Sequence, residues 1–168
     1  EKEKLVMKPN AGTHGDGFYK LEYTDGVFFV NEKESSADRI KELISSQKSS
    51  YVITEYIEMH RDLKKIYPGS VNTIRIMVIN DKITSPQIAN AYLRIATKKT
   101  GNTDNIGSGG VCARINLETG EIFEPEKIKN HIITPCPVHP DTGVIIRGVI
   151  PNWREIKEGV KDVSRYIC

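Results

Sequence analysis

The sequence predicts an α+β protein with two lobes, built mostly from antiparallel strands with a few helices. Residues 1–57 have the pattern strand, glycine-rich loop, strand, strand, helix and strand, whereas residues 58–168 are mostly extended. A polar connection at residues 58–70, with one or two helical turns stopped by Pro68 and Gly69, separates the two parts. We therefore expect a first lobe at 1–57 and a second at 58–168.

Composition excludes several classes of protein. A chain of 168 residues with 38% hydrophobic and 27% charged residues is typical of a soluble globular protein. The net charge of +2 gives no bulk attraction to nucleic acid. No apolar stretch approaches the ~20 residues of a membrane span, and no signal peptide opens the chain. Three cysteines without metal-like spacing predict reduced thiols and a cytoplasmic location.

A glycine-rich loop follows the first predicted strand. Lys8 stands at its base, and Gly12, Gly15 and Gly17 follow. Glycines let backbone N–H groups approach an anion closely, and a lysine adds a charge. No Gly-Lys-Ser/Thr ends the loop and a strand follows it, so it is neither a P-loop nor a dinucleotide fingerprint. The loop is a candidate phosphate-binding hairpin, with an ordinary flexible hairpin as the alternative.

The remaining elements follow from periodicity and from turn signals. In the first lobe we expect strands at 18–23, 27–30 and 51–57 and an amphipathic helix at 36–47 capped by Ser35 or Ser36. In the second lobe we expect strands at 71–79, from 83 onwards, at 89–96 and at 109–116, and an irregular Pro-rich segment at 125–143. A final helix should be capped by Asn152 in a capping box with Glu155 and bury Ile156, Val160, Val163 and Ile167.

Glu55, Tyr56 and Ile57 end a strand just before the connection between the lobes. A strand end offers a backbone donor, a backbone acceptor and apolar walls, which a purine requires. The three residues are a candidate adenine seat. A plain exit from an edge strand is the alternative.

Two arginines lie inside apolar strands. A charge there is costly unless it is paired, so Arg75 and Arg94 either form structural ion pairs or hold an anionic ligand. Two such arginines on neighbouring strands favour the ligand. Asn105 precedes Gly109 and Gly110, two glycines at which the backbone can approach another group closely. Asn105 is therefore a candidate site residue, and a simple turn is the alternative.

A histidine and a tryptophan are weaker candidates for functional residues. His139 and Asp141 can form an acid–base pair, although the pattern favours an Asx-type turn. Trp153 begins the last helix, where packing is favoured over a substrate platform. The sequence has no zinc-type arrangement of Cys and His and no serine in a nucleophile elbow.

Taken in order, these motifs resemble the ATP-grasp superfamily across nearly the whole chain. They are Lys8-Pro-Asn-Ala-Gly-Thr-His-Gly-Asp-Gly17, Ile53-Thr-Glu-Tyr-Ile57, Asn72-Thr-Ile-Arg75, and Asp104-Asn105 with Gly109-Gly110. The branch it resembles in particular is that of sugar-transfer-associated ATP-grasp proteins, found with polysaccharide biosynthesis genes. The phrases that carry this are Pro68-Gly-Ser-Val-Asn72, His139-Pro-Asp-Thr-Gly143 and Gly148-Val-Ile-Pro-Asn-Trp153.

The resemblance implies an ATP site between two α+β lobes, with Mg²⁺ as the second cofactor. Lys8 would contact phosphate, residues 12–17 would form a lid, and Glu55, Tyr56 and Ile57 would seat adenine. Glu58 would bind ribose. Arg75 and Arg94 would face phosphate or an acyl phosphate, and Asn105 the acceptor. His139, Asp141 and Trp153 are branch-specific and are candidates for acceptor selectivity.

The resemblance also implies a reaction, in which ATP activates a carboxylate as an acyl phosphate and an amine displaces the phosphate. The substrate would be a carboxylate-bearing small molecule or a saccharide precursor in polysaccharide or cell-envelope biosynthesis. A non-catalytic nucleotide-binding or scaffold module is the alternative. The family's metal ligands, an acidic residue followed by Glu-x-Asn, are absent from the sequence. We therefore expect a piece of a longer enzyme, truncated at both ends, with no metal ligands and no activity alone.

Overall fold

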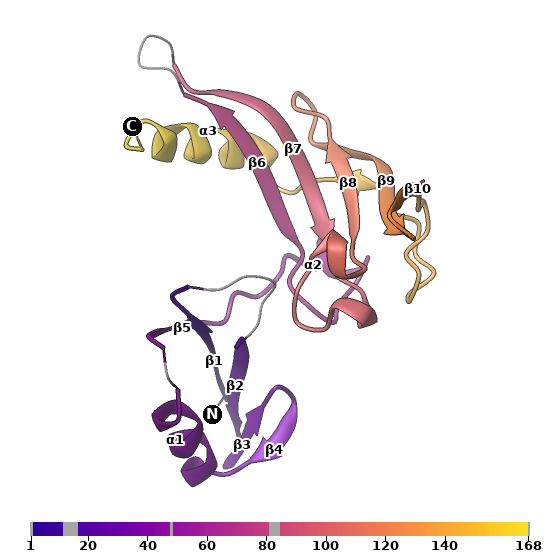
Figure 1. The fold of residues 1–168 in the computed structure, drawn as a ribbon. Coiled ribbons are helices and arrows are strands. Elements are labelled where there is room, and N and C mark those ends of the chain that lie inside the picture. The colour runs from indigo at the N-terminus through magenta and orange to yellow at the C-terminus, as the bar shows by residue number, and fades with distance from the viewer. Residues whose placement is uncertain (1, 12–16, 48, 81–84, 168) are drawn as a thin grey trace. The chain divides into compact units, whose positions relative to one another are not determined.

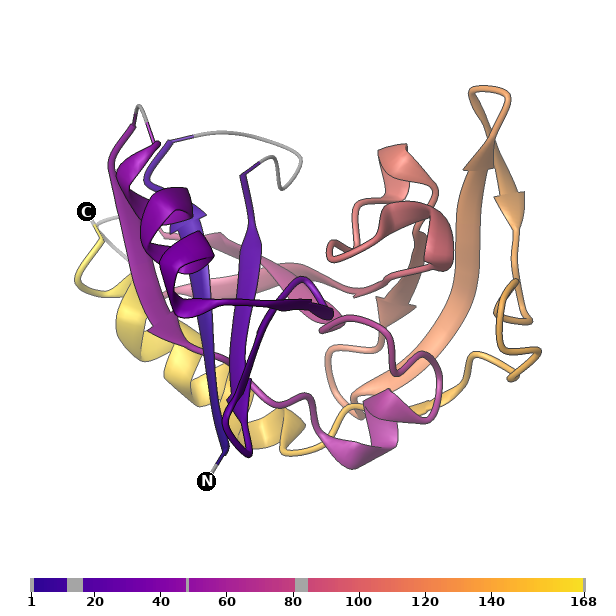
Figure 2. The same ribbon diagram turned by 90° about the horizontal axis from the view of Figure 1, so that it is seen from below.

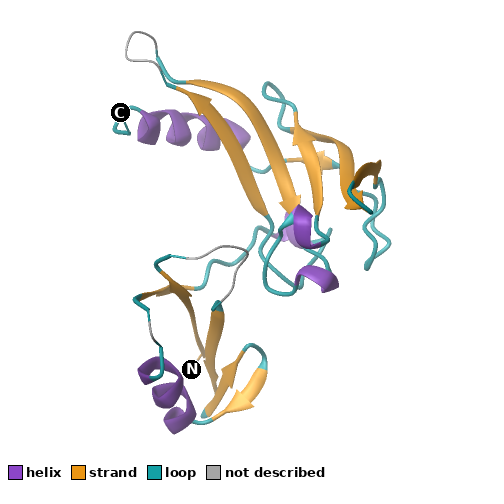
Figure 3. Ribbon diagram, in the orientation of Figure 1, coloured by secondary structure: helices purple, strands orange, loops and turns teal. Residues whose placement is uncertain are grey.

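The structure is a computed structural model that describes residues 2–11, 17–47, 49–80 and 85–167 (Figure 1). Contacts between residues divide the chain into two compact units, Glu1–Glu58 and Met59–Cys168. Each unit contains one antiparallel sheet, and the described part holds three α-helices in all (Figure 3). The α+β class with mostly antiparallel strands and few helices is therefore confirmed.

Unit 1 is a sheet of five strands in the order β4-β3-β2-β1-β5. Its elements are β1 (Lys2–Pro9), β2 (Tyr19–Thr24), β3 (Val27–Val30), β4 (Lys33–Ser35), α1 (Ala37–Ser45) and β5 (Tyr51–Glu55). β1 is an interior strand, next to the edge strand β5, and pairs antiparallel with both β2 and β5. Residues separated by about fifty positions along the chain therefore become neighbours in the sheet.

Two tight turns set the register of unit 1. Asp25 and Gly26 join β2 to β3 with φ angles of 49° and 89°, and Asn31 and Glu32 join β3 to β4 with 48° and 66°. Two residues with positive φ match the right-handed twist of a hairpin, which is why Asp-Gly and Asn are favoured there. α1 begins after Ser36, whose hydroxyl accepts a hydrogen bond from the Arg39 amide at 3.2 Å. The predicted helix and its cap are confirmed.

Unit 2 is built on the sheet order β10-β9-β8-β7-β6, with β11 paired to the outer side of β9. Its strands are β6 (Thr73–Ile79), β7 (Gln87–Ile95), β8 (Val111–Ile115), β9 (Glu121–Lys129), β10 (Ile132–Pro135) and β11 (Gly148–Val149). Its helices are α2 (Arg61–Lys64), α3 (Trp153–Ser164) and the single 3₁₀ turns η1 (Lys98–Thr100) and η2 (Ile106–Ser108).

One face of this second sheet carries the core. Leu93 and Ile95 of β7 and Val111 of β8 are completely buried. Trp153 and Ile156 of α3 pack in the same cluster, so α3 covers this face. Since side chains alternate along a strand, the intervening residues of β6, β7 and β8 point to the opposite, polar face.

The segment at 125–143 is more ordered than predicted. It contains the end of β9 and the whole of β10, which form a hairpin. Pro125 suggested a break because proline cannot donate a ladder hydrogen bond. The register between β8 and β9 shifts at this point, and Glu124 adopts a φ of 46°, so Pro125 lies at a bulge where no donor is required.

Three other predictions for unit 2 were wrong in detail. The strand expected at 89–96 is the main part of a longer strand that begins at Gln87. Asn152 precedes α3, but it has a φ of 55° and its side chain makes no capping hydrogen bond, so there is no capping box. The expected buried stripe covers only the first half of α3, because Val163 is 59% exposed and Ile167, beyond the helix, is 70% exposed.

Candidate functional site

A group of lysines lies on one face of unit 1. Lys4 and Lys8 of β1 share a face because they are an even number of residues apart. Lys20 of β2 lies opposite Val6 in the register and therefore belongs to the same face. The ammonium groups of Lys4 and Lys20 lie 5.4 Å and 5.2 Å from the centre of the Tyr56 ring. We call Lys4, Lys8, Lys20 and Tyr56 the lysine face.

Carboxylates fix two of these three lysines. Lys4 Nζ lies 3.1 Å from Glu58 Oε1, and this hydrogen bond raises the pKa of Lys4 above its ordinary value. Lys20 Nζ lies 3.5 Å from Glu32 and 3.7 Å from Glu22. Lys8 is exposed and has no ion pair with any residue that the structure describes. Of the three lysines, Lys8 is the one without a described carboxylate partner, which makes it the candidate for a ligand anion.

The glycine loop follows directly after β1. Gly12 and Gly15 lie outside the described residues. Gly17 has a φ of 75°, and a Cβ on it would lie 2.6 Å from the Tyr51 hydroxyl. The backbone angle therefore favours glycine at this position, and a larger residue would also displace the end of the Tyr51 side chain at the start of β5.

The predicted adenine seat lies at the edge of the sheet. Tyr56 donates its backbone N–H to the Lys4 carbonyl at 3.1 Å, so it faces β1. Backbone groups alternate in direction along an antiparallel strand, and Glu55 therefore directs its N–H and C=O away from β1. No described strand pairs with that side of β5. Ile57, two residues beyond Glu55, is 74% exposed.

In unit 2, the polar side of the sheet collects arginines from neighbouring strands. Thr73 is paired with Arg94 and Arg75 with Tyr92, so all four side chains share one face. On β8, Cys112 is opposite Arg94 and Arg114 is opposite Tyr92. We call Thr73, Arg75, Tyr92, Arg94, Cys112 and Arg114 the arginine face.

Arg94 is held in place by a buried carboxylate. Its Nη2 lies 2.7 Å from Asp104 Oδ1. The other oxygen of Asp104 accepts the Thr73 backbone N–H at 2.9 Å and the Thr73 hydroxyl. Asp104 is only 6% exposed. The sequence offered a structural ion pair as one option for Arg94 but did not identify Asp104, ten positions further along the chain, as its partner.

Arg75 differs from Arg94 in having no such partner. It is exposed, and within the described ranges no carboxylate forms an ion pair with it. Its position is diagonal to Arg94 across β6 and β7. An exposed guanidinium of this kind can donate two parallel hydrogen bonds to a phosphate or carboxylate anion.

Cys112 lies directly beside these arginines. Burial raises the pKa of its thiol above the ordinary value, and the nearby Arg94 only partly offsets that effect. The thiol is therefore mostly protonated at neutral pH.

Most polar groups of the loop before β8 form hydrogen bonds within the loop itself. The Asn105 side-chain oxygen accepts from the Gly107 amide at 2.9 Å, and the Asn105 carbonyl accepts from Ser108 and Gly110 at 3.1 Å and 3.0 Å. A Cβ on Gly110 would lie 2.9 Å from the carbonyl oxygens of Asn105 and Asp104. The backbone that Gly110 must approach is thus that of its own loop, as in the turn interpretation.

His139 is the centre of another loop. It is 1% exposed, and its ring stacks on Tyr67 with centroids 5.0 Å apart. Nε2 lies 2.8 Å from the Ala96 carbonyl, which can only accept, so Nε2 carries the proton. Nδ1 accepts from the amides of Asp141 and Thr142, both at 3.3 Å. Both ring nitrogens are engaged in this turn.

Asp141 and Trp153 also make structural contacts. An Asp141 carboxylate oxygen accepts the Lys98 amide at 2.7 Å. Trp153 is 5% exposed and donates Nε1–H to the Leu117 carbonyl at 3.0 Å. A Cβ on Gly120 would lie 2.8 Å from the Trp153 side chain. Trp153 therefore packs on the core side of the sheet, away from the arginine face.

Comparison with known proteins decides the family. The family model described as "Sugar-transfer associated ATP-grasp" matches residues 1–168. The chain belongs to this ATP-grasp family. No curated protein and no solved structure matches it significantly. Membership indicates an ATP-binding, ligase-like function, and it confirms the family predicted from the sequence.

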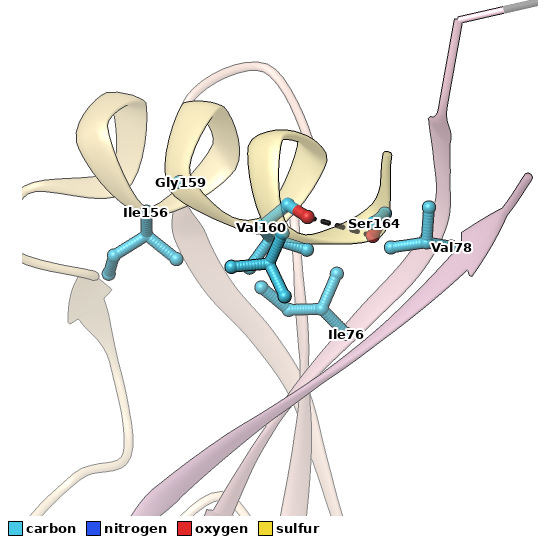
Figure 4. Close-up of a pocket in the computed structure, with 7 residues that line it drawn as sticks. Ile76, Val78, Ile156, Gly159, Val160 and Ser164 are labelled. Carbon is cyan, nitrogen blue, oxygen red and sulfur yellow. Dashed lines mark hydrogen bonds between the residues drawn. The ribbon is translucent and has the colours of Figure 1, made fainter. Parts of the chain in front are cut away.

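An apolar groove in this ATP-grasp chain was not predicted. It lies between α3 and β6 and has a volume of about 640 Å³ (Figure 4). Its lining is Ile76, Val78, Ile156, Gly159, Val160, Val163 and Ser164. The Ser164 hydroxyl donates to the Val160 carbonyl at 2.8 Å, so its proton is already used within α3. Lacking charge and lying on the core side of the sheet, the groove is separate from the arginine face.

The part of the chain that the structure describes contains neither a metal-ligand cluster nor a membrane-spanning helix. No group of three or more His, Cys, Asp or Glu side chains there is arranged to hold a metal ion. No helix in the same ranges is long and apolar enough to cross a bilayer.

Proposed function

We propose that this chain binds ATP as the nucleotide-binding part of a carboxylate–amine ligase. The observation that carries the proposal is Arg75, an exposed arginine without an ion pair among the described residues, next to an arginine that Asp104 holds in a fixed orientation. Membership of the ATP-grasp family makes ATP the ligand to test.

The β5 edge of unit 1 suits a purine. In the proposal, the outward Glu55 carbonyl accepts the exocyclic amino group and the Ile57 amide donates to a ring nitrogen. Glu58, already oriented by Lys4 at 3.1 Å, is the candidate for ribose hydroxyls. Lys8 is the candidate for phosphate, because it is the lysine of this face without a described carboxylate partner.

The arginine face of unit 2 suits a phosphoryl group. A guanidinium donates two parallel hydrogen bonds to phosphate oxygens, and such charge-assisted bonds are stronger than neutral ones. Arg75 would make these contacts. Arg94 is already bonded to Asp104, so it would contribute its positive charge and its remaining N–H donors to the phosphoryl group. Asn105, with its side-chain oxygen bonded to Gly107, would retain its amide hydrogens for an acceptor.

The proposed reaction has two steps. A substrate carboxylate oxygen attacks the γ-phosphorus, and the bond to the β-phosphate oxygen breaks to release ADP. An amine then attacks the acyl carbon, and inorganic phosphate leaves. Negative charge develops on the phosphoryl oxygens in the first step, where fixed arginines stabilise it most. For the substrate we propose a carboxylate-bearing saccharide precursor in polysaccharide or cell-envelope biosynthesis, in keeping with the sugar-transfer description of the family.

ATP-grasp proteins generally use ATP with Mg²⁺, so the described residues were tested for a fit to this ion. Mg²⁺ takes one or two carboxylates together with phosphate oxygens. Three described acids lie next to the arginine face: Asp104 is bonded to Arg94 and Thr73, Glu124 lies 3.4 Å from Arg114, and Glu126 lies opposite Cys112 in the register. No three His, Cys, Asp or Glu side chains in the described ranges are grouped to hold a metal ion. These residues do not form a Mg²⁺ site, and the residue roles given above do not depend on the ion. We also propose a cytosolic location, since Cys112 and Cys136 are free thiols.

Calorimetric titration with ATP tests the residue assignments. Replacing Arg75→Met or Lys8→Met should weaken ATP binding about tenfold to a hundredfold, the cost of a hydrogen bond to a charged group. Arg154→Met and Lys33→Met, which remove exposed charges elsewhere in the same units, should leave the affinity unchanged. Unchanged affinity in both the Arg75 and the Lys8 variants would show that the site is misplaced.

A second assay separates the ligase from a non-catalytic nucleotide binder. The full-length protein that contains this chain should release ADP and phosphate only when a carboxylate substrate is present. ATP binding without carboxylate-dependent turnover, across a panel of uronic acids and amino acids, would favour the binding module.

A further inference from the structure

The β9–β10 hairpin exposes aliphatic side chains on both of its faces. Ile132 and Ile133 are 65% and 62% exposed although they are consecutive, so they point to opposite faces of the strand. Ile128 lies opposite Ile133 and is 38% exposed, whereas Lys129 lies opposite Ile132. We call residues 127–133 the hairpin tip.

The tip is also basic. Lys127 and Lys129 flank Ile128, and residues 127–140 contain no Asp or Glu although the whole chain has 22 acidic residues. Asn130 and His131 form its turn with φ angles of 52° and 63°. A two-residue turn makes the end narrow. In Figure 2 this hairpin, drawn in orange, extends beyond the rest of the sheet of unit 2.

We propose that the hairpin tip binds an anionic lipid surface. The isoleucines enter the boundary between head groups and acyl chains, and the two lysines contact lipid phosphates. The choice of a lipid surface over a protein partner follows from the geometry. A narrow tip with an exposed isoleucine on each face, and with lysines beside Ile132, can be surrounded by anionic lipid, whereas a protein surface covers one face and leaves the other in water.

The proposal is independent of the proposed ATP site. The hairpin tip shares no residue with the lysine face or the arginine face. Because the described helices include no membrane span, binding would be peripheral and reversible.

Vesicle flotation of the whole chain tests the proposal. The protein should float with vesicles of phosphatidylcholine mixed with phosphatidylglycerol, float poorly with phosphatidylcholine alone, and be released by added salt. Ile132→Ser with Ile133→Ser should weaken binding about tenfold or more, since two aliphatic side chains no longer enter the lipid. Lys127→Gln with Lys129→Gln should also weaken binding to the anionic vesicles about tenfold or more.

Matched variants control for non-specific effects. Val163→Ser with Ile167→Ser removes aliphatic side chains that are 59% and 70% exposed outside the hairpin. Lys33→Gln with Lys41→Gln removes two exposed charges from unit 1. Both pairs should float like the parent protein. Circular dichroism should show that all variants are folded, because none of the residues is buried.

Three results would overturn the proposal. The parent protein fails to float with anionic vesicles, or the hairpin variants float as well as it does. In the third, the isoleucine variant changes the oligomeric state in size-exclusion chromatography while flotation is unaffected, in which case the tip is a protein interface.

Discussion

Arg75 and Arg94 show how two residues of one type on one sheet face differ in role. The sequence places both inside apolar strands and predicts for each either an ion pair or an anion. The structure pairs Arg94 with Asp104 at 2.7 Å and leaves Arg75 exposed without a described carboxylate. Which alternative applies depends on a loop that returns to the strand, and alternation along a strand carries no information about that loop.

Cys112 provides a chemical probe of the same face. Burial raises the pKa of its thiol, so the thiolate fraction at neutral pH is smaller than that of an ordinary cysteine. Alkylation by iodoacetamide at pH 7 should therefore be slower than for glutathione and should accelerate as the pH rises. Peptide mass mapping of the modified protein measures the rate at this cysteine alone.

The alkylation rate of Cys112 should decrease further when ATP is bound, if phosphate lies against Arg75 and Arg94, because a nearby negative charge disfavours the thiolate. Buried Cys136, at 4% exposure, serves as the internal reference that stays unmodified in the folded protein. Alkylation of Cys112 as fast as glutathione at pH 7 would contradict the assigned pKa direction.

Among the elements, the loop from η1 to β8 depends on close backbone packing at Gly110. A Cβ there would lie 2.9–3.0 Å from three backbone carbonyl oxygens, which cannot move as a side chain can. Gly110→Ala should therefore destabilise unit 2 by about 1–3 kcal/mol. Gly159→Ala in α3 meets no atom within 4 Å and should stabilise it by about 0.5–1 kcal/mol.

Urea unfolding followed by tryptophan fluorescence measures both changes. Trp153 is the single tryptophan of the chain and lies in the core of unit 2, so its signal reports this unit. If Gly110→Ala and Gly159→Ala shift the midpoint in the same direction, the packing argument for Gly110 is wrong.

The sequence predicts most of the helices and strands, but it predicts few of the contacts between them. Turn chemistry locates the Asp25–Gly26 hairpin, and the Ser36 cap locates α1, because both signals are local. The β9–β10 hairpin was not predicted, because Pro125 argues against a strand. The bulge that accommodates Pro125 has no recognisable signal in the nearby sequence. His139 and Trp153 make the turn and packing contacts that their local sequence favoured, but their partners Ala96 and Leu117 come from distant segments. Their part in acceptor selectivity stays a prediction.

In the molecule as a whole, the two units have unequal cores. In the described part of unit 1, the buried hydrophobic residues are Val6, Met7 and Leu21. The core of unit 2 extends over β7, β8, β9 and α3 and includes residues that are completely buried. Apolar burial is the main favourable term in folding, so unit 1 should be the less stable of the two.

Hydrogen exchange followed by mass spectrometry tests this difference. Amides of β1 should exchange faster than those of β7 and β8. All three strands are hydrogen-bonded on both sides, so the comparison reflects stability rather than missing hydrogen bonds. Equal or greater protection of β1 would mean that unit 1 gains stability from something other than its own core.

The open side of β5 has a further consequence. Its outward backbone groups form no ladder with a described strand, and its side chains Val52 and Ile53 are 41% and 48% exposed. An unpaired apolar strand edge is also a template on which extended chains assemble. On the proposed function, a purine on this edge would occupy the same hydrogen-bonding groups. Bound nucleotide would then prevent other extended chains from pairing with this edge, and aggregation of the protein should decrease as the fraction of chains with bound nucleotide increases.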